Sequence, residues 1–356
     1  MRDWNRRDFL KGTGVLLGSA ALPLEVLAAA YPSRPITAFI ATKQGGGVDG
    51  VARSLAPLME PRLNNATINV INKTGATGSI AGTHVLGLPP DGYSWFCAGG
   101  FNRGLRAMGL MTAVPYETWQ YYGADTSIAS ISVPPDSPIK DMEDLIRRAK
   151  DNPGKLRMAT NGLGGTWHLA AALIMQQSGT KFRIVPYKGG KPATTAALKS
   201  EVDVAVSGLH EQLDVIKAGR LRNFCIATDK PLAIQGQNLK PITDYIPGLK
   251  GKTPIGGGMS MAMRRDTDPA ILRQVADVWL AAVNSKEFHA IDMKKPRFPD
   301  PVVGEAADKR ATLWEVIAAN LLYSVKKAKR SPKEIGLPSI DEFENWWPPK
   351  GYKPRI

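Results

Sequence analysis

Two glycine-rich loops are the residues of this sequence whose types and spacing could do chemistry. The first, Gly45-Gly46-Gly47, follows the apolar run 36–42 and precedes a helical pattern that begins at Val51. The second, 161–166, opens a helical pattern that extends through Gln177. Glycine permits a close approach of the backbone, and the first turn of a helix has N–H groups without intrahelical acceptors. Each loop therefore predicts anion binding at a helix N-terminus.

The first loop also has the spacing of a dinucleotide-binding turn, Gly45-x-Gly47-x-x-Gly50. That turn requires a carboxylate about 20 residues further on to hold the ribose. No Asp or Glu occurs between Glu60 and Asp91. We therefore expect no nicotinamide and no other cofactor. An exported α/β enzyme that uses this loop remains the alternative.

The strength of anion binding at these loops indicates that both are needed. One helix N-terminus contributes about 0.3–2 kcal/mol and each hydrogen bond to a charged group about 1.5–3 kcal/mol. Micromolar affinity requires about 8 kcal/mol. Two loops that face each other around one carboxylate could supply it. The pattern thus predicts a cleft between two domains that close over the ligand by a hinge.

Alternating strand and helix patterns predict an α/β fold with a mostly parallel sheet in each of two layers. The first domain is expected to comprise 31–127 and 225–356, and the second 128–224. Asp141 and Asp268 are predicted helix caps. A long helix over about 305–327 and a Pro- and Trp-containing tail complete the chain.

The first 30 residues resemble a twin-arginine export signal. Arg6-Arg7 precede Phe9-Leu10-Lys11, a small and apolar stretch follows, and 28–30 offers a cleavage site near Ala30. Pro23 and Glu25 make this stretch too short to span a bilayer. We expect a cleaved signal over 1–30 and a protein located in the periplasm.

The charge and the cysteines restrict the partners further. The formal net charge is +14, which suits anionic solutes, and no basic-aromatic motif indicates nucleic acid. Cys97 and Cys225 are the two cysteines, with no metal-type spacing to histidine. We expect no metal site, and either two buried thiols or one disulfide.

Several motifs, in order along the chain, resemble the solute-binding receptors of tripartite tricarboxylate transporters, often called Bug receptors. The resemblance runs from about Tyr31 to Phe288. The motifs are 31–36, 45–49, 72–78, 89–93, 152–156, 162–171 and 185–190. It implies a two-domain periplasmic-binding-protein fold of type II-like architecture and no catalysis. It also implies a monomer that binds an organic carboxylate and delivers it to membrane permease subunits. A receptor-derived sensor or scaffold is a further alternative.

Carried over by position, the resemblance implies a ligand-binding set drawn from both domains. The set is Lys43, Gln44, Gly45, Gly46, Gly47, Asp49, Phe101, Asn102, Asn161, Gly162, Gly164, Gly165, Thr166, Trp167, His168, Tyr187, Lys188, Gly189 and Asp203.

Three departures from the family pattern bear on the ligand. Lys43-Gln44 replace small neutral residues, and Lys43 either pairs with a ligand carboxylate or is solvated. Trp167 stands where small residues are common and is either a ligand contact or a core residue. The run 99–103 replaces a hydroxyl-rich segment. Together they suggest an aromatic or bulky carboxylate, and a di- or tricarboxylate also fits.

Overall fold

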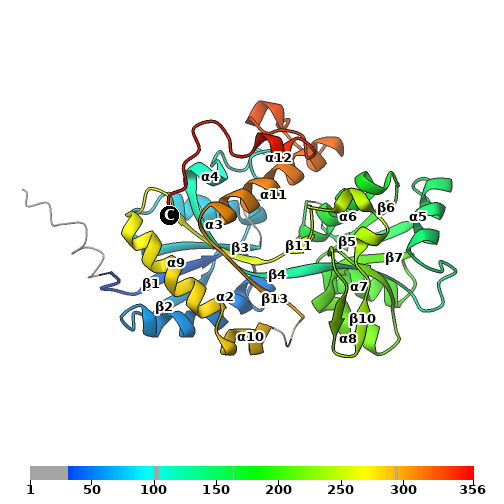
Figure 1. The fold of residues 1–356 in the computed structure, drawn as a ribbon, viewed down its shortest axis with the longest axis horizontal. Coiled ribbons are helices and arrows are strands. Elements are labelled where there is room, and N and C mark those ends of the chain that lie inside the picture. Colours follow the sequence, from blue (N-terminus) through cyan, green and yellow to red (C-terminus); the bar gives the residue numbers. More distant parts are fainter. Residues whose placement is uncertain (1–30, 100–103, 163, 293, 295) are drawn as a thin grey trace, which may run out of the picture.

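The computed structural model describes residues 31–99, 104–162, 164–292, 294 and 296–356. Figure 1 shows them as two lobes joined by extended strands. The expected signal over 1–30 and the expected ligand contacts Phe101 and Asn102 lie outside the described residues. No helix among the described residues is both long and apolar enough to cross a membrane.

The first lobe is built around a parallel sheet in which β1 lies between β2 and β3. Its N-terminal elements are β1 (Ile36–Ile40), α2 (Gly47–Met59), β2 (Ile68–Asn72), α3 (Ser79–Leu86) and β3 (Ser94–Gly99). Its later elements are α4 (Pro115–Thr118), β12 (Met259–Arg264), α9 (Pro269–Val283) and α10 (Lys286–Asp292). The apolar face of α2, including Val51, Leu55 and Met59, packs into the same core as Trp279 of α9. This packing fixes the start of α2 beside the end of β1.

The second lobe repeats this arrangement, with β5 parallel to both β6 and β7. Its elements are α5 (Met142–Asp151), β5 (Arg157–Asn161), α6 (Thr166–Ser178), β6 (Arg183–Tyr187), α7 (Gly190–Leu198), β7 (Val204–Gly208), α8 (Leu209–Lys217), β8 (Arg222–Ile226), β9 (Leu232–Ile234) and β10 (Gln237–Leu239). Helix α6 begins beside the end of β5, as α2 begins beside the end of β1.

The long strand β4 (Trp119–Val133) connects the two lobes (Figure 1). Its first half pairs antiparallel with β12, and its second half pairs antiparallel with β7 and β8. Two further strands, β11 (Gly256–Gly257) and β13 (Phe298–Val302), pair with its middle. The expectation of a mostly parallel sheet is wrong at this centre. A strand that passes from one lobe to the other meets strands of the opposite direction in both.

Residues 225–255, which the sequence assigned to the first domain, pack with the second lobe. Ile226, Leu249 and Ile255 share a hydrophobic core with Met158 and Leu173 of that lobe. The chain pairs with the middle of β4 again at β11. We therefore propose that the second domain extends to about residue 255. The alternation of strand and helix could not reveal this, because it does not indicate which sheet a strand joins.

The C-terminal helix α11 (Gly304–Ser324) lies along the first lobe and reaches the second (Figure 1). It packs against α4, β4 and α6. Ile317 and Leu321 belong to the core that also holds Leu173 of α6. The short helix α12 (Phe343–Trp346) follows in the tail. The C-terminal region therefore contacts both lobes.

Local predictions made from residue chemistry are confirmed. The Asp141 side chain accepts a hydrogen bond from Asp144 N, and the Asp268 side chain accepts one from Ala270 N. Cys97 and Cys225 are free and buried, so the interpretation as two thiols is correct and the disulfide is wrong.

Candidate functional site

A cavity of about 570 Å³ lies between the lobes and is lined by residues of both. From the first lobe come the end of β1, the start of α2, the turn 75–78 and the end of β3. From the second come the starts of α6, α7 and α8. The lining residues are Ala41, Thr42, Gly46, Gly47, Val48, Gly75, Thr77, Gly78, Phe96, Ala98, Gly99, Leu105, Ser127, Asn161, Gly164, Gly165, Thr166, Trp167, Lys188, Gly189, Gly190, His210, Glu211, Gly257, Gly258 and Arg297.

The first glycine loop, Gly45–Gly47, is stabilised by a hydrogen bond from its backbone to the Asp49 side chain. One Asp49 carboxylate oxygen accepts a hydrogen bond from Gly45 N at 2.9 Å, and the other accepts one from Asn72 Nδ2 at 2.8 Å. Burial opposes ionisation of Asp49, but hydrogen bonds from Arg53, Gly45 and Asn72 outweigh it and lower its pKa. Asp49 does not line the cavity. It was expected to bind ligand and instead fixes the shape of the loop.

The start of α2 is open toward the cavity. Gly46 is the N-cap and no side chain caps the helix. Within the described part of the chain, the N–H groups of Gly47 and Val48 have no acceptor. Gly45 has a φ of +76°, a conformation that glycine adopts without strain. This terminus therefore presents unsatisfied donors to an anion.

The second glycine loop, 161–165, differs because its helix is already capped. The Asn161 side-chain oxygen accepts hydrogen bonds from Trp167 N and His168 N, each at 3.0 Å. Gly164 N donates to His168 Nδ1 at 3.0 Å. Burial lowers the pKa of His168, which favours the neutral ring that this acceptor role requires. Two first-turn donors of α6 are thus used internally.

Trp167 is a core residue, and its contact with a ligand stays a prediction. Its side chain is buried and belongs to the hydrophobic core of the second lobe. It also lines the cavity, where its ring lies 6.2 Å from that of His210. The large Trp167 side chain therefore forms part of the second-lobe wall of the cavity.

Six polar residues that line the cavity were not among the expected ligand contacts: Thr42 and Thr77 near the first-lobe turns, and Ser127, His210, Glu211 and Arg297. Ser127 Oγ and His210 Nδ1 are 2.5 Å apart. A Glu211 oxygen accepts a hydrogen bond from Gly208 N at 2.8 Å, and burial raises the Glu211 pKa. No motif contained the last four, because Ser127 lies within β4, His210 and Glu211 follow β7, and Arg297 precedes β13, all far along the chain from either loop.

Several expected residues do not line the cavity. Lys43, Gln44, Gly45 and Gly162 are exposed and are not among the residues that line the cavity. Tyr187 lines a separate hollow with α7. Asp203 pairs with Arg157 at 2.9 Å on the outside of the second lobe. His168 acts inside the second loop. The cavity does include Gly46, Gly47, Asn161, Gly164, Gly165, Thr166, Trp167, Lys188 and Gly189.

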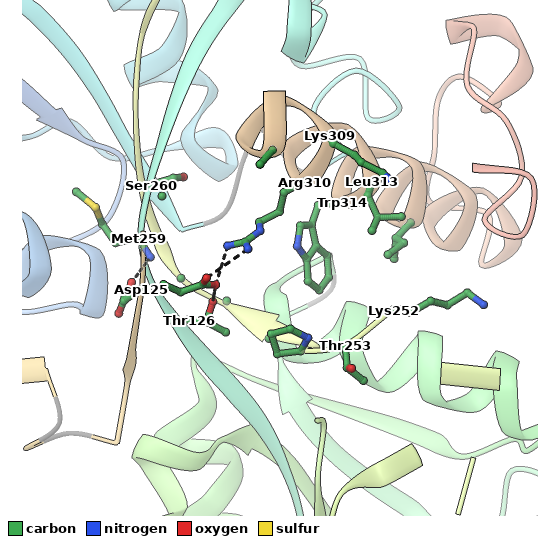
Figure 2. Close-up of a pocket in the computed structure, with 18 of the residues that line it drawn as sticks. Asp125, Thr126, Lys252, Thr253, Met259, Ser260, Lys309, Arg310, Leu313 and Trp314 are labelled. Carbon is green, nitrogen blue, oxygen red and sulfur yellow. Dashed lines mark hydrogen bonds and ion pairs between the residues drawn. The ribbon is translucent and has the colours of Figure 1, made fainter. Parts of the chain in front are cut away.

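A second cavity of about 310 Å³ lies on the other side of the connecting strands and is covered by α11. Figure 2 shows Arg310 of α11 extended toward Thr126 of β4, with the Trp314 ring beside it. Its charges are paired: Arg310 bonds Asp300 at 2.6 Å and Lys309 bonds Glu344 at 2.7 Å. Because the first cavity has unpaired donors and this one has matched charges, the first is the candidate ligand site.

A metal is not indicated by the described residues, where no group of three or more His, Cys, Asp or Glu side chains could hold one. The donors that line the first cavity include backbone N–H groups, the Arg297 guanidinium and the Lys188 ammonium, beside one carboxylate, Glu211. This cavity is therefore a candidate anion site.

Comparison with protein families gives one match, over residues 51–307, described as "Tripartite tricarboxylate transporter family receptor". A curated relative is the "UPF0065 protein in tcbD-tcbE intergenic region" of Pseudomonas sp. strain P51. It is 30% identical over 227 residues, which cover 61% of this chain and 65% of the relative. The aligned part thus spans just under two thirds of that relative.

Solved structures share the fold. A TctC solute binding protein from Polaromonas superposes with a TM-score of 0.72 at 23% identity, covering 83% of this chain and 99% of that one. MatC from Rhodopseudomonas palustris, solved with bound malate, superposes with a TM-score of 0.64 at 18% identity, covering 81% of this chain and all of that one. The two-lobed α/β architecture expected from the sequence is confirmed.

Proposed function

Because the chain belongs to the tripartite tricarboxylate transporter receptor family, we propose that it captures an organic carboxylate between its lobes and delivers it to membrane permease subunits. The observation that carries the ligand class is the uncapped start of α2, which opens into a cavity lined by both lobes. Malate in a protein of the same fold supports a carboxylate. Neither cofactor nor catalysis is part of this proposal.

Binding is proposed to close the cleft. Ser127 lies in β4, and Gly257 and Gly258 lie in or beside β11, so the cavity floor is made by the strands that connect the lobes. A ligand that contacts α2 on one side and the start of α6 or α7 on the other is more favourable when the lobes approach. Closure is therefore the expected response to a ligand that touches both lobes.

The test is a thermal-unfolding panel on the mature protein. The probes are benzoate, malate, adipate and citrate, with benzamide as the neutral control. A ligand at 100 times its Kd adds about 2.7 kcal/mol to the free energy of unfolding. We expect at least one carboxylate, and not benzamide, to raise the midpoint. If no organic carboxylate does so across a wider set, the proposed ligand class is wrong.

The enzyme alternative has its own test. An absorbance spectrum of the purified protein would reveal a bound nucleotide, which the proposed function does not include. A stoichiometric nucleotide spectrum would favour an exported enzyme over a receptor.

Export by the twin-arginine route is proposed for residues 1–30. Replacing Arg6 and Arg7 together with lysine should leave the precursor inside the cell, because that route requires the arginine pair. Fractionation followed by immunoblotting measures this, and unchanged periplasmic protein would contradict it.

A further inference from the structure

Arg297 is a buried cation at the junction of the lobes. It lies between α10 and β13 and is 6% exposed. Its Nε donates to Asp125 of β4, and Asp292 Oδ1 of α10 is 3.7 Å from the same atom. Two carboxylates thus fix one edge of the guanidinium.

The other edge faces the first turn of α2. Arg297 lines the first cavity, and a Cβ placed on Gly47 would overlap its Nη1 atom. Among the described residues, Nη1 and Nη2 donate no hydrogen bond. The N–H groups of Gly47 and Val48, which also lack acceptors there, lie at the same place. Charged and backbone donors therefore converge on one part of the cavity.

We infer that Arg297 and the first turn of α2 together bind one carboxylate of the solute, and that Arg297 determines the preference for anionic solutes. This assignment rests on the proposed function and names the side chain that carries it. The planar fork of a guanidinium matches the two oxygens of a carboxylate. The helix dipole favours the same charge.

The charges around Arg297 allow an added anion to bind beside it. Burial, followed by repulsion from Asp125, raises the pKa of Asp292 and favours its protonated form. Burial lowers the pKa of Arg297, but attraction to Asp125, Asp292 and Glu211 raises it overall and keeps it charged. Asp125 is then the main counter-charge, and the Nη edge can pair with a solute.

The side chains that line the cavity near Arg297 indicate the chemistry of the solute beyond its carboxylate. Phe96 and Leu105 of the first lobe and Trp167 of the second line the same cavity. These side chains offer apolar contact, and Lys188 of the second lobe is a further cation in the lining. The expected solute therefore has one carboxylate at Arg297 and a largely apolar body, and a second anionic group would face Lys188.

The first experiment compares binding by isothermal titration calorimetry in the wild type, Arg297→Gln, Arg297→Lys and Arg264→Gln. The probes are benzoate, adipate, malate and citrate. Arg264 is the matched control, because it also pairs with an aspartate, Asp266, but lies outside both cavities. We expect Arg297→Gln to weaken the tightest carboxylate by about 30-fold or more and Arg297→Lys by less. Arg264→Gln should bind as the wild type does.

The second measurement does not depend on the choice of carboxylate. Crystals of the wild type and Arg297→Lys are soaked in bromide, and anomalous scattering locates the ion. A bromide between residue 297 and Gly47 supports the site even if no probe carboxylate binds, in which case only the proposed ligand class fails. Carboxylate binding that Arg297→Gln leaves unchanged overturns the role of Arg297 while the receptor function stands. Absence of both bromide and carboxylate there overturns both.

Discussion

Each glycine loop connects a parallel strand to the next helix of its lobe, but the two helix starts differ in whether a side chain caps them. The first glycine loop ends at an uncapped helix with Arg297 beside it, whereas the second ends at a helix whose first donors bond Asn161. A similar strand–loop–helix sequence therefore produced an open anion site in one lobe and a self-contained turn in the other. The sequence treated them as equal partners around one carboxylate. We propose that the first loop supplies the charge recognition and that the second supplies a shaped wall.

Gly47→Ala tests the first glycine loop and should give the largest loss of carboxylate affinity among these variants. The added Cβ would overlap Arg297 Nη1, so the guanidinium must move away from α2. We expect a loss of about 10- to 100-fold in carboxylate affinity, equivalent to about one charged hydrogen bond. Calorimetric titration with the tightest carboxylate measures it.

The matched control for that change is Gly50→Ala, where an added Cβ meets no atom within 4 Å. Its affinity should stay within twofold of the wild type. If Gly47→Ala also binds normally, the contact between Arg297 and the first turn of α2 does not matter for binding.

Asn161→Ala tests the second glycine loop, whose helix Asn161 caps. It removes the acceptor for Trp167 N and His168 N, and loss of a helix cap costs typically ~1 kcal/mol of stability. Urea denaturation measures the free energy of unfolding, and Asn161→Asp, which keeps an acceptor oxygen, should restore most of it. Carboxylate affinity should fall less than in Gly47→Ala. An equal loss in both variants would show that the loops are equivalent after all.

The carboxylates behind the first loop predict a pH dependence. Burial and the charge of Asp125 raise the folded pKa of Asp292 to about 7, above its value of about 3.9 in an unfolded chain. Between these values the folded state holds more protons at this site than the unfolded state. The contribution of Asp292 to stability is thus full below pH ~4 and is lost as the pH rises through 7, by at most about 1.4 kcal/mol per pH unit.

Asp292→Asn isolates that contribution. The variant should gain stability relative to the wild type between pH 4 and 7, as measured by denaturation at several pH values. Subtracting the two stability curves removes the contributions of other groups with raised pKa values, such as the buried Glu315 and Asp308. Parallel curves for the two proteins would contradict the shifted Asp292.

Asp203→Asn should give the smallest effect. Asp203 pairs with Arg157, and the two side chains are 29% and 41% exposed. Exposed pairs contribute about 0.2–1 kcal/mol. We expect carboxylate affinity to remain within twofold, since the pair lies away from the first cavity. A large loss of affinity would return Asp203 to the ligand site, where the family resemblance had placed it.

Local features were predictable where the cause lies within a few residues. Asp141 and Asp268 cap helices because a short acidic side chain can reach the donors just ahead of it. The strand–loop–helix units were predictable from apolar periodicity. The course of β4 was not, because only pairing with strands of both lobes, far away in the sequence, extends it over 15 residues.

By itself the sequence determined two glycine-rich loops at helix starts, their α/β lobes and the family resemblance, and the structure decided that the two cysteines are free thiols. Only the tertiary structure decided which loop stays open. Asn161 precedes α6 by five residues and caps it, whereas Thr42, five residues before α2, makes no hydrogen bond through its hydroxyl among the described residues. Arg297 reaches α2 from about 250 residues away. No local pattern encodes that contact, because it depends on the pairing of β13 with β4 and on the buried carboxylates that hold the guanidinium in place.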